Sequence, residues 1–168
     1  MRSIRASGDY LHFAPINVTT TEVRIVHTPS SFRLTGLLSL CFLIFTGIAS
    51  SAHADFTATL QSVRSGKCVD VSGSSQANRA TIIQYSCHAG DNQRIRFEQF
   101  PDTDDYLLRF QHSEKCLEIP INNTQNGTDV YQTDCHANKN QRWRIEELGN
   151  NQIRIVQVQS GKVLDVEG

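Results

Sequence analysis

Two stretches with the same pattern decide the fold: SGKCVDV at residues 65–71 and SEKCLEI at residues 113–119. The second stretch begins 48 residues after the first. The tripeptide Cys-His-Ala recurs with the same offset, at residues 87–89 and 135–137. A period of this length indicates repeated supersecondary units, each unable to bury its apolar side alone.

A further motif closes each repeat, and a third copy of the opening motif lies near the C-terminus. NQRIR at residues 92–96 returns as NQRWR at residues 140–144. SGKVLDV at residues 160–166 has Val163 where the first two copies have cysteine. The chain therefore contains two complete repeats and a partial third, with expected bounds 56–103, 104–151 and 152–168.

Each repeat is made of short β-branched or aromatic runs separated by Gly, Ser, Asn and Asp clusters, which predicts strands and turns. In the first repeat these runs are residues 56–63, 68–71, 81–85 and 93–97. No window has a helical period. Four short strands per repeat indicate a closed or nearly closed all-β fold. We expect the fold to be incomplete in the third repeat, either because the sequence is truncated there or because a partner chain or self-association fills its open edges.

Composition narrows the classes of function. The chain has 168 residues, a formal net charge of −1 and 20% charged residues. That balance argues against a nucleic-acid-binding protein that relies on a basic surface. The 39% of hydrophobic residues is enough for a folded core.

The N-terminal third differs from the rest. Residues 34–49 are apolar and uncharged, Arg33 precedes them, and a small-x-small pattern at Ala52–Ala54 follows. This is the layout of a secretory signal peptide, which we place at residues 34–54 with cleavage after Ala54. The apolar run is shorter than the roughly 20 residues that span a bilayer as a helix, although an uncleaved anchor and a buried core helix stay open as alternatives.

Residues 1–33 show no sustained period, and we interpret them as a long leader or a mis-called start. They are therefore excluded from the expected fold. The expected domain is residues 55–168, exported to the extracellular space or the periplasm.

Four cysteines lie in that domain, and export makes disulfides their default use. Of the three possible connectivities, the repeat favours Cys68–Cys87 and Cys116–Cys135, because each bond then stays within one repeat. A zinc site built on the adjacent Cys-His pairs lacks the usual ligand spacing, so no metal is expected.

These motifs resemble the ricin B-type lectins and the related xylan-binding modules, over about residues 56–168. Repeats of that family form a β-trefoil and end in Gln-x-Trp. The second repeat has Gln141-Arg142-Trp143, and the first has Gln93-Arg94-Ile95. The resemblance implies a β-trefoil of 48-residue repeats with Trp143 in its core, a carbohydrate ligand and no cofactor.

The resemblance also implies a sugar site in the first repeat. Asp70 and Asn92 would bind sugar hydroxyls, and Tyr85 would stack on the apolar face of a pyranose. His88 would be a supporting polar contact, and Gln93 would brace the loop and Asp70. The residue types suit this chemistry, because carboxylates make strong hydrogen bonds and amides both donate and accept.

The second repeat departs from this pattern, and we expect its site to be weak. Glu118 replaces the aspartate, and Thr133 stands where the first repeat has Tyr85. Tyr131, two residues earlier, could partly replace the missing ring. Three other residues of this second site match those of the first: His136, Asn140 and Gln141. The third repeat keeps Asp165 without partner residues.

The leading hypothesis is a secreted, non-catalytic lectin module that binds galactose- or xylose-type sugars mainly through the first repeat. The alternative is a sugar-independent β-trefoil, such as a protein-binding toxin subunit or a protease inhibitor. A glycosidase would need two carboxylates, and the candidates Asp104, Asp105, Glu146 and Glu147 are expected on solvated surface. No catalytic residue is therefore expected.

Overall fold

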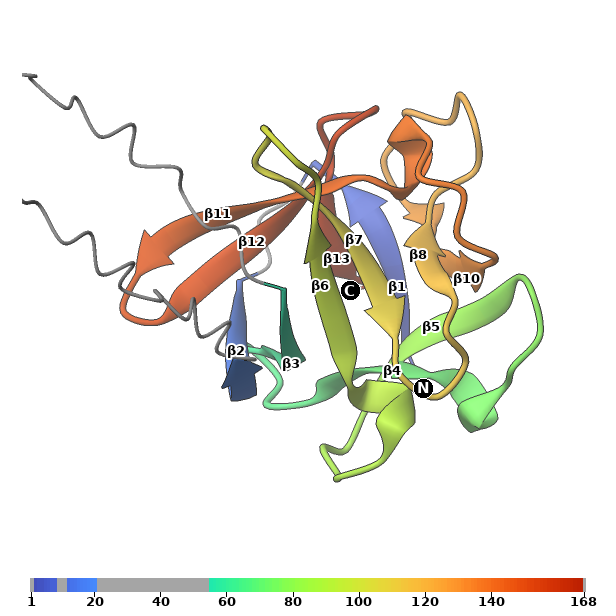
Figure 1. The fold of residues 1–168 in the computed structure, drawn as a ribbon. Helices are drawn as coiled ribbons and strands as arrows, with labels where there is room; N and C mark the ends of the chain where they lie inside the picture. Colours follow the sequence, from blue (N-terminus) through green and yellow to red (C-terminus); the bar gives the residue numbers. More distant parts are fainter. Residues whose placement is uncertain (1, 9–11, 21–54, 168) are drawn as a thin grey trace, which may run out of the picture.

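The computed structural model describes residues 2–8, 12–20 and 55–167. They form a single 13-stranded antiparallel network with three short 3₁₀ turns, η1 (Ser72–Ser74), η2 (Asp91–Gln93) and η3 (Lys139–Gln141). The strands, shown in Figure 1, are β1 (Arg2–Ser7), β2 (Phe13–Thr20), β3 (Phe56–Ser62), β4 (Cys68–Val71), β5 (Ala80–Tyr85), β6 (Ile95–Gln99), β7 (Asp105–Phe110), β8 (Cys116–Glu118), β9 (Thr128–Asp129), β10 (Tyr131–Thr133), β11 (Trp143–Gly149), β12 (Gln152–Gln157) and β13 (Val163–Val166). No helix among these residues has the length and apolar character needed to cross a membrane.

The first two repeats have the same internal pairing, as the 48-residue period predicts. In each, the first strand pairs with the fourth, β3 with β6 and β7 with β11. The second strand pairs with the third, β4 with β5 and β8 with β10. Hairpins between repeats join β6 to β7 and β11 to β12. The all-β trefoil prediction is confirmed.

The third unit is assembled from both ends of the chain. The C-terminal residues supply its first two strands, β12 and β13, and β1 and β2 occupy the places of the third and fourth. The matching first-to-fourth rungs in the three units are Ala58↔Ile95, Tyr106↔Trp143 and Ile153↔Phe13. In Figure 1, β1 lies beside β13, next to the C-terminus, and β2 lies beside β3.

Two predictions about the ends of the chain are therefore wrong. Residues 1–33 were expected outside the fold, but residues 2–7 and 13–20 are strands within it. The open edges expected in the third repeat, and the partner chain or second copy expected to fill them, are replaced by β1 and β2. The physical reason is that Ile4, Ala6 and Phe13 supply buried apolar side chains, at most 1% exposed, where the third unit needs them. The predicted signal peptide at 34–54 lies outside the described residues.

One hydrophobic cluster fills the interior and draws on all three units. Trp143 is fully buried, and its indole N–H donates to the carbonyl of Leu117 at 3.0 Å. Phe97 is also fully buried and stacks on Phe56, with ring centroids 4.6 Å apart. The prediction that Trp143 is a core residue is confirmed.

In each of the first two units, one disulfide joins the second strand to the loop that follows the third strand. The two bonds are Cys68–Cys87 and Cys116–Cys135, as the repeat predicts. Closing loops of this length stabilises the folded state by about 3 kcal/mol each in the chain-entropy model.

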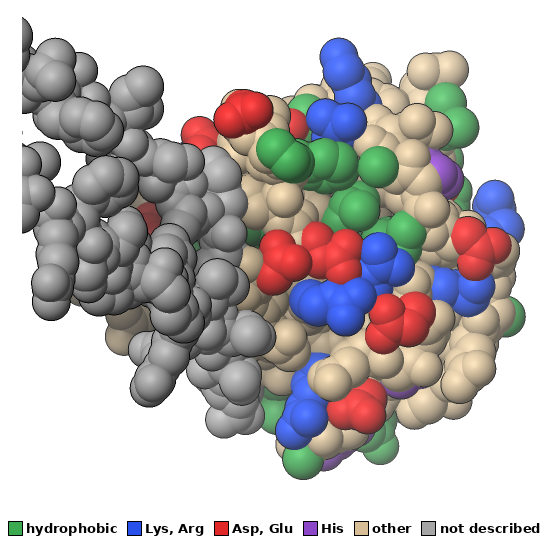
Figure 2. Space-filling model, in the orientation of Figure 1, with side chains coloured by type: hydrophobic (Ala, Val, Ile, Leu, Met, Phe, Trp, Pro, Cys, Tyr) green, Lys and Arg blue, Asp and Glu red, His purple; other side chains and the backbone are tan. Residues whose placement is uncertain are grey.

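Acidic and basic side chains are interspersed on the face that Figure 2 shows. Between β6 and β7, Glu98 accepts hydrogen bonds from Arg109 at 2.8 Å and from Arg96 at 2.6 Å. Burial opposes ionisation of Glu98, but the two guanidinium groups outweigh it and hold the pKa of this carboxyl below its usual range. Arg96 also pairs with Glu114 at 3.1 Å, so the two arginines are balanced by two glutamates.

The burial of β2 predicts the effect of one truncation. Phe13→Ala should lower the free energy of unfolding by about 3–5 kcal/mol, the cost of emptying a core phenylalanine site, and Phe97→Ala should cost a similar amount. Denaturant unfolding of both variants measures this. Ile121→Ala is the control, because Ile121 is 63% exposed and its truncation should change stability by less than about 0.5 kcal/mol. A Phe13→Ala cost as small as that of the control would contradict the placement of β2 in the core.

Candidate functional site

The first unit brings its predicted site residues together around one cavity. Asp70 lies on β4, Tyr85 ends β5, and Asn92 lies in η2, while His88 lies in the loop between β5 and η2. The cavity has a volume of about 260 Å³, and its lining is Asp70, Gly73, Ser74, Ile83, Tyr85, His88 and Asn92. Four of the five predicted residues therefore line it, and the fifth, Gln93, does not.

Asp70 is buried, and only one of its carboxylate oxygens is engaged. Gln93 donates from Nε2 to Oδ2 of Asp70 at 2.7 Å, and Nε2 of His88 lies 3.3 Å from the same oxygen. Oδ1 receives no hydrogen bond from any residue that the structure describes. The carboxylate is thus held in place while retaining acceptor capacity on the cavity side.

Gln93 lies behind this carboxylate as a brace. It is fully buried, and its side-chain amide donates to Asp70 and to the carbonyl of Ser86, at 3.0 Å. Its Oε1 accepts from the backbone N–H of His88 at 2.9 Å. With these contacts Gln93 ties the loop after β5 to β4, and its role is to position Asp70 and His88.

Gly90 determines how His88 is oriented. Its backbone N–H donates to Nδ1 of His88 at 3.0 Å, so a neutral imidazole carries its proton on Nε2, the atom facing Asp70. A Cβ at position 90 would lie 2.6 Å from the imidazole and 2.7 Å from Oδ1 of Asn92. Only glycine leaves room for this arrangement of the loop.

Tyr85 provides an accessible ring at the rim of the cavity. It is 43% exposed, and its ring meets the His88 ring edge-on with centroids 6.2 Å apart. Ile83 lines the cavity on the same face of β5, whereas Gln84 points away and accepts a hydrogen bond from Ser65 at 2.7 Å. Strand alternation predicts this arrangement.

The second unit repeats the brace but engages both carboxylate oxygens. Oε2 of Glu118 lies 2.7 Å from Nε2 of His136 and accepts from Gln141 at 2.7 Å. Oε1 accepts from the hydroxyl of Tyr131 at 3.0 Å. Asn140 is buried and donates to the carbonyl of Ile119 at 3.1 Å. Four of the five predicted second-site residues, Glu118, Tyr131, His136 and Gln141, therefore contact one another, and Asn140 bonds the backbone of β8's neighbour Ile119.

The Tyr131 ring is also covered on one side. The guanidinium carbon of Arg79, from the first unit, lies 4.8 Å from the ring centroid. Burial, together with the hydrogen bond to Glu118 and its charge, raises the pKa of the Tyr131 hydroxyl above its ordinary value. Arg79 escaped the sequence analysis because it belongs to a different repeat, and no sequence motif connects it to Tyr131.

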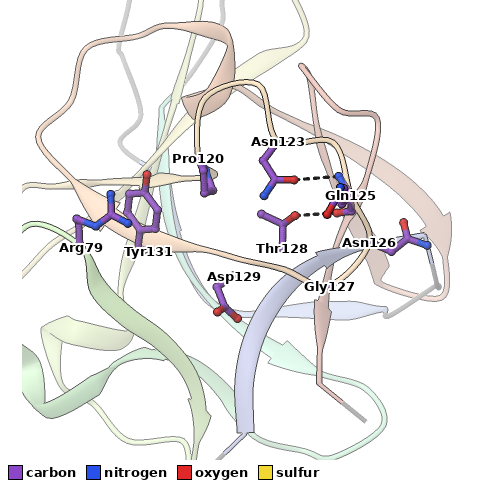
Figure 3. Close-up of a pocket in the computed structure, with 9 residues that line it drawn as sticks. All are labelled: Arg79, Pro120, Asn123, Gln125, Asn126, Gly127, Thr128, Asp129 and Tyr131. Atoms are coloured by element: carbon purple, nitrogen blue, oxygen red, sulfur yellow. Dashed lines mark hydrogen bonds between the residues drawn. The ribbon is translucent and has the colours of Figure 1, made fainter.

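A larger cavity of about 370 Å³ lies beside the second unit, offset from the predicted site (Figure 3). Its wall is the loop before β9, where Asn123 accepts from the backbone of Gln125 and Thr128 donates to the carbonyl of Gln125. Of the second-site residues it includes only Tyr131; the full lining is Arg79, Pro120, Asn123, Gln125, Asn126, Gly127, Thr128, Asp129 and Tyr131.

In the third unit, Asp165 has a ladder partner that the sequence analysis did not foresee. Arg5 on β1 pairs with it across the strands, at the position that Ile83 takes opposite Asp70. The Arg5 guanidinium forms ion pairs with Asp129 at 2.8 Å and Glu167 at 2.8 Å. This unit therefore places an arginine with two acidic partners where the first unit has Ile83.

Comparison with known proteins agrees with this architecture. Residues 56–168 match the model of the ricin-type β-trefoil lectin domain. The comparison with curated proteins gave no match.

Three solved structures illustrate the likeness. ThreeFoil, a designed threefold-symmetric protein, is 38% identical with a TM-score of 0.64, over 67% of this chain and 79% of its own. The exo-β-1,3-galactanase 1,3Gal43A from Clostridium thermocellum is 26% identical with a TM-score of 0.50, over 52% of this chain and 19% of the enzyme. A Polyporus squamosus lectin, solved with a sialylated epitope, is 15% identical with a TM-score of 0.50, over 61% of this chain and 40% of the lectin, and shares the fold. The family match over most of the chain, on a trefoil with braced carboxylates in two units, shows that the chain belongs to the ricin-type β-trefoil lectin family of carbohydrate-binding modules.

Proposed function

We propose that this protein is a secreted, non-catalytic lectin module that binds a galactose- or xylose-type sugar through its first unit. The observation that carries the proposal is the state of Asp70, a buried carboxylate whose Oδ2 is braced by Gln93 while Oδ1 accepts no hydrogen bond from the described residues. A carboxylate held this way beside an exposed ring suits a ligand with an apolar face and adjacent hydroxyls.

Each remaining group in the cavity has a place in such a complex. Tyr85 offers its exposed ring to the C–H face of the pyranose. Asn92 donates its Nδ2 to the carbonyl of Val71 at 3.3 Å, so its Oδ1 is the atom for a sugar hydroxyl. The Nε2–H of His88 lies at the Asp70 carboxylate and lends it positive electrostatic potential.

The second unit contributes little to binding in this proposal. Glu118 uses both oxygens on Tyr131, His136 and Gln141, so a sugar hydroxyl would have to displace one of these donors. Thr133 replaces the stacking ring, and Arg79 covers one side of Tyr131. Glu118 receives the hydroxyl of Tyr131, whereas Ile83, the residue opposite Asp70 in the first unit, has no hydroxyl to donate.

Of the four acidic residues considered for glycoside hydrolysis, two form ion pairs with arginines and two, Asp104 and Glu147, are exposed. Asp105 is buried and forms an ion pair with Arg144 at 3.1 Å, and Glu146 pairs with Arg154. Carboxylates engaged in ion pairs are poor candidates for a raised-pKa acid, which supports a binding role over catalysis. Export of the protein is supported by its two disulfides, which persist in oxidising compartments.

The proposal predicts an unequal pair of variants. Tyr85→Ala should weaken sugar binding by about 1–3 kcal/mol, roughly 5- to 150-fold in Kd, because the ring supplies the apolar contact. Thr133→Ala, at the equivalent position of the second unit, should leave Kd within a factor of about two. A glycan array identifies the sugar, and isothermal titration with that sugar measures both variants.

Two outcomes would decide against this assignment. Equal losses from the two variants would overturn the one-site proposal. If the folded protein binds no glycan on the array, the sugar-independent β-trefoil is favoured instead. Such a protein would be a protein-binding toxin subunit or a protease inhibitor.

Both carboxylate oxygens of Glu118 have hydrogen-bond partners within the protein, and this predicts an effect on stability. Tyr131→Phe removes the hydroxyl donor from a buried carboxylate and should lower the free energy of unfolding by roughly 1–2 kcal/mol, toward the lower end for a hydrogen bond to a charged group because Tyr131 is only partly buried. Tyr85→Phe is the matched control, with an expected change below about 0.5 kcal/mol, since the Tyr85 hydroxyl has no hydrogen-bond partner among the described residues. Urea unfolding at neutral pH compares the two.

The raised pKa of Tyr131 sets the direction of an alkaline effect. In the folded protein this hydroxyl keeps its proton above the ordinary pKa of 10.0, whereas in the unfolded chain it ionises there. Its contribution to stability is complete below that pKa and is lost as the pH rises through the folded pKa. Stability measured across this alkaline window should fall less steeply in Tyr131→Phe than in the wild type. A residual slope should remain, because burial and the charges of Asp104 and Asp55 also raise the pKa of Tyr106.

A further inference from the structure

We infer that residues 2–20 are a separable complementing segment, held in the trefoil by noncovalent contacts alone, so that the chain can be cut between β2 and β3 and remain one folded, sugar-binding assembly. The β1–β2 segment, as we call it, comprises the described residues 2–8 and 12–20. The surface that receives it is formed by strands of all three units.

Strand β1 is embedded among three neighbours. It pairs with β13 along four rungs, from Ile4↔Val166 to Ser7↔Val163. It also pairs with β5 near its start and with β9 near its end. Strands β9 and β10, separated by one residue, together take the third-strand place of the second unit, and β10 pairs with β5. The third strands of the three units therefore contact one another in a ring, which β1 completes. Removing β1 would open it.

Strand β2 closes the other part of the sheet. It pairs with β3 from Phe13↔Ser62 to Thr20↔Phe56, and with β12 at Phe13↔Ile153. Its pairing with β3 corresponds to the pairing of β6 with β7 and of β11 with β12, in which the fourth strand of one unit pairs with the first strand of the following unit. The third hairpin between units is thus made from strands on either side of residues 21–54.

The ends of that hairpin show why covalent continuity is dispensable. Thr20 and Phe56 are direct partners on the ladder, so the strand ends on either side of residues 21–54 lie on the same rung. The equivalent hairpin between the second and third units, β11–β12, closes with a short turn at Gly149↔Gln152. No pairing of β1 or β2 among the described residues depends on the connection, and the buried side chains Ile4, Ala6 and Phe13 anchor the segment directly.

The segment also supports the proposed sugar site. Ser3 pairs with Ile83 and Arg2 with Gln84, on the strand that ends at Tyr85. Loss of β1 would expose this edge of β5 and free the strand that carries the ring.

The test uses the full-length protein with a specific protease recognition sequence inserted between Val26 and His27. After cleavage, both pieces should co-elute in size-exclusion chromatography, and native mass spectrometry should give one complex with the mass of the uncut monomer plus the water added by hydrolysis. Amide hydrogens of Ile4, Ala6 and Phe13 should exchange as slowly as those of Leu60 on β3, before and after the cut. These readouts do not require the protein to bind sugar, so they stand apart from the proposed function.

Matched variants test the contacts. Ile4→Asp places an unpaired carboxylate in the core and should weaken retention of the cut segment by roughly a hundredfold. Arg2→Ala, on the exposed start of the same strand, should leave retention unchanged. Replacing residues 21–54 with the Gly-Asn-Asn turn of residues 149–151 should give a stable trefoil with unaltered sugar affinity.

Three results would overturn the inference. One is release of the segment while residues 55–168 keep their fold and affinity. Another is precipitation on cleavage, because the noncovalent contacts would then be insufficient. The third is a native mass of two chains with exchanged segments, because the segment would then come from the second copy.

Discussion

Closure of the sheet is the constraint on which the rest of this structure depends. A single four-strand unit cannot cover its own apolar side, and a sheet with open edges exposes unpaired backbone groups. Two units and the strands β12 and β13 leave two places unfilled, and β1 and β2 take them. Buried Ile4 and Phe13 then join Trp143 and Phe97 in one core. The N-terminal segment therefore belongs to the fold even though it carries neither the cysteine pair nor the Gln-x-Trp motif.

Within this frame, the same amide–carboxylate pair organises two units with different results. Gln93 braces Asp70, and Gln141 braces Glu118, each at 2.7 Å. The extra methylene and the hydroxyl of Tyr131 satisfy the second carboxylate internally, whereas Asp70 keeps an oxygen for a ligand. One scaffold thus carries a braced site with spare acceptor capacity and a structural copy of it, as expected where function resides in side chains placed on a common fold.

Much of the fold and of the first site could be predicted from local pattern. The 48-residue period, the disulfide pairing and the shared face of Ile83 and Tyr85 follow from residue spacing and strand alternation, and the burial of Trp143 follows from the resemblance to the lectin family. The contact of Arg79 with Tyr131 could not, because it joins different units. The roles of Gly90 and Oδ1 of Asp70 also depend on distances of a few ångströms that no spacing encodes.

By itself, the sequence determined the repeat, the strand pattern and the cysteine pairing, because these depend on neighbours close along the chain, and its resemblance to the lectin family indicated the polar residues of the first unit. Only the tertiary structure decided what completes the third unit. The short alternation of apolar residues in β1 is too weak a signal to identify a strand whose partners begin about 80 residues away and end beyond residue 160. Its stability comes from the surface that receives it, and that surface exists only once the other strands have folded around the common core.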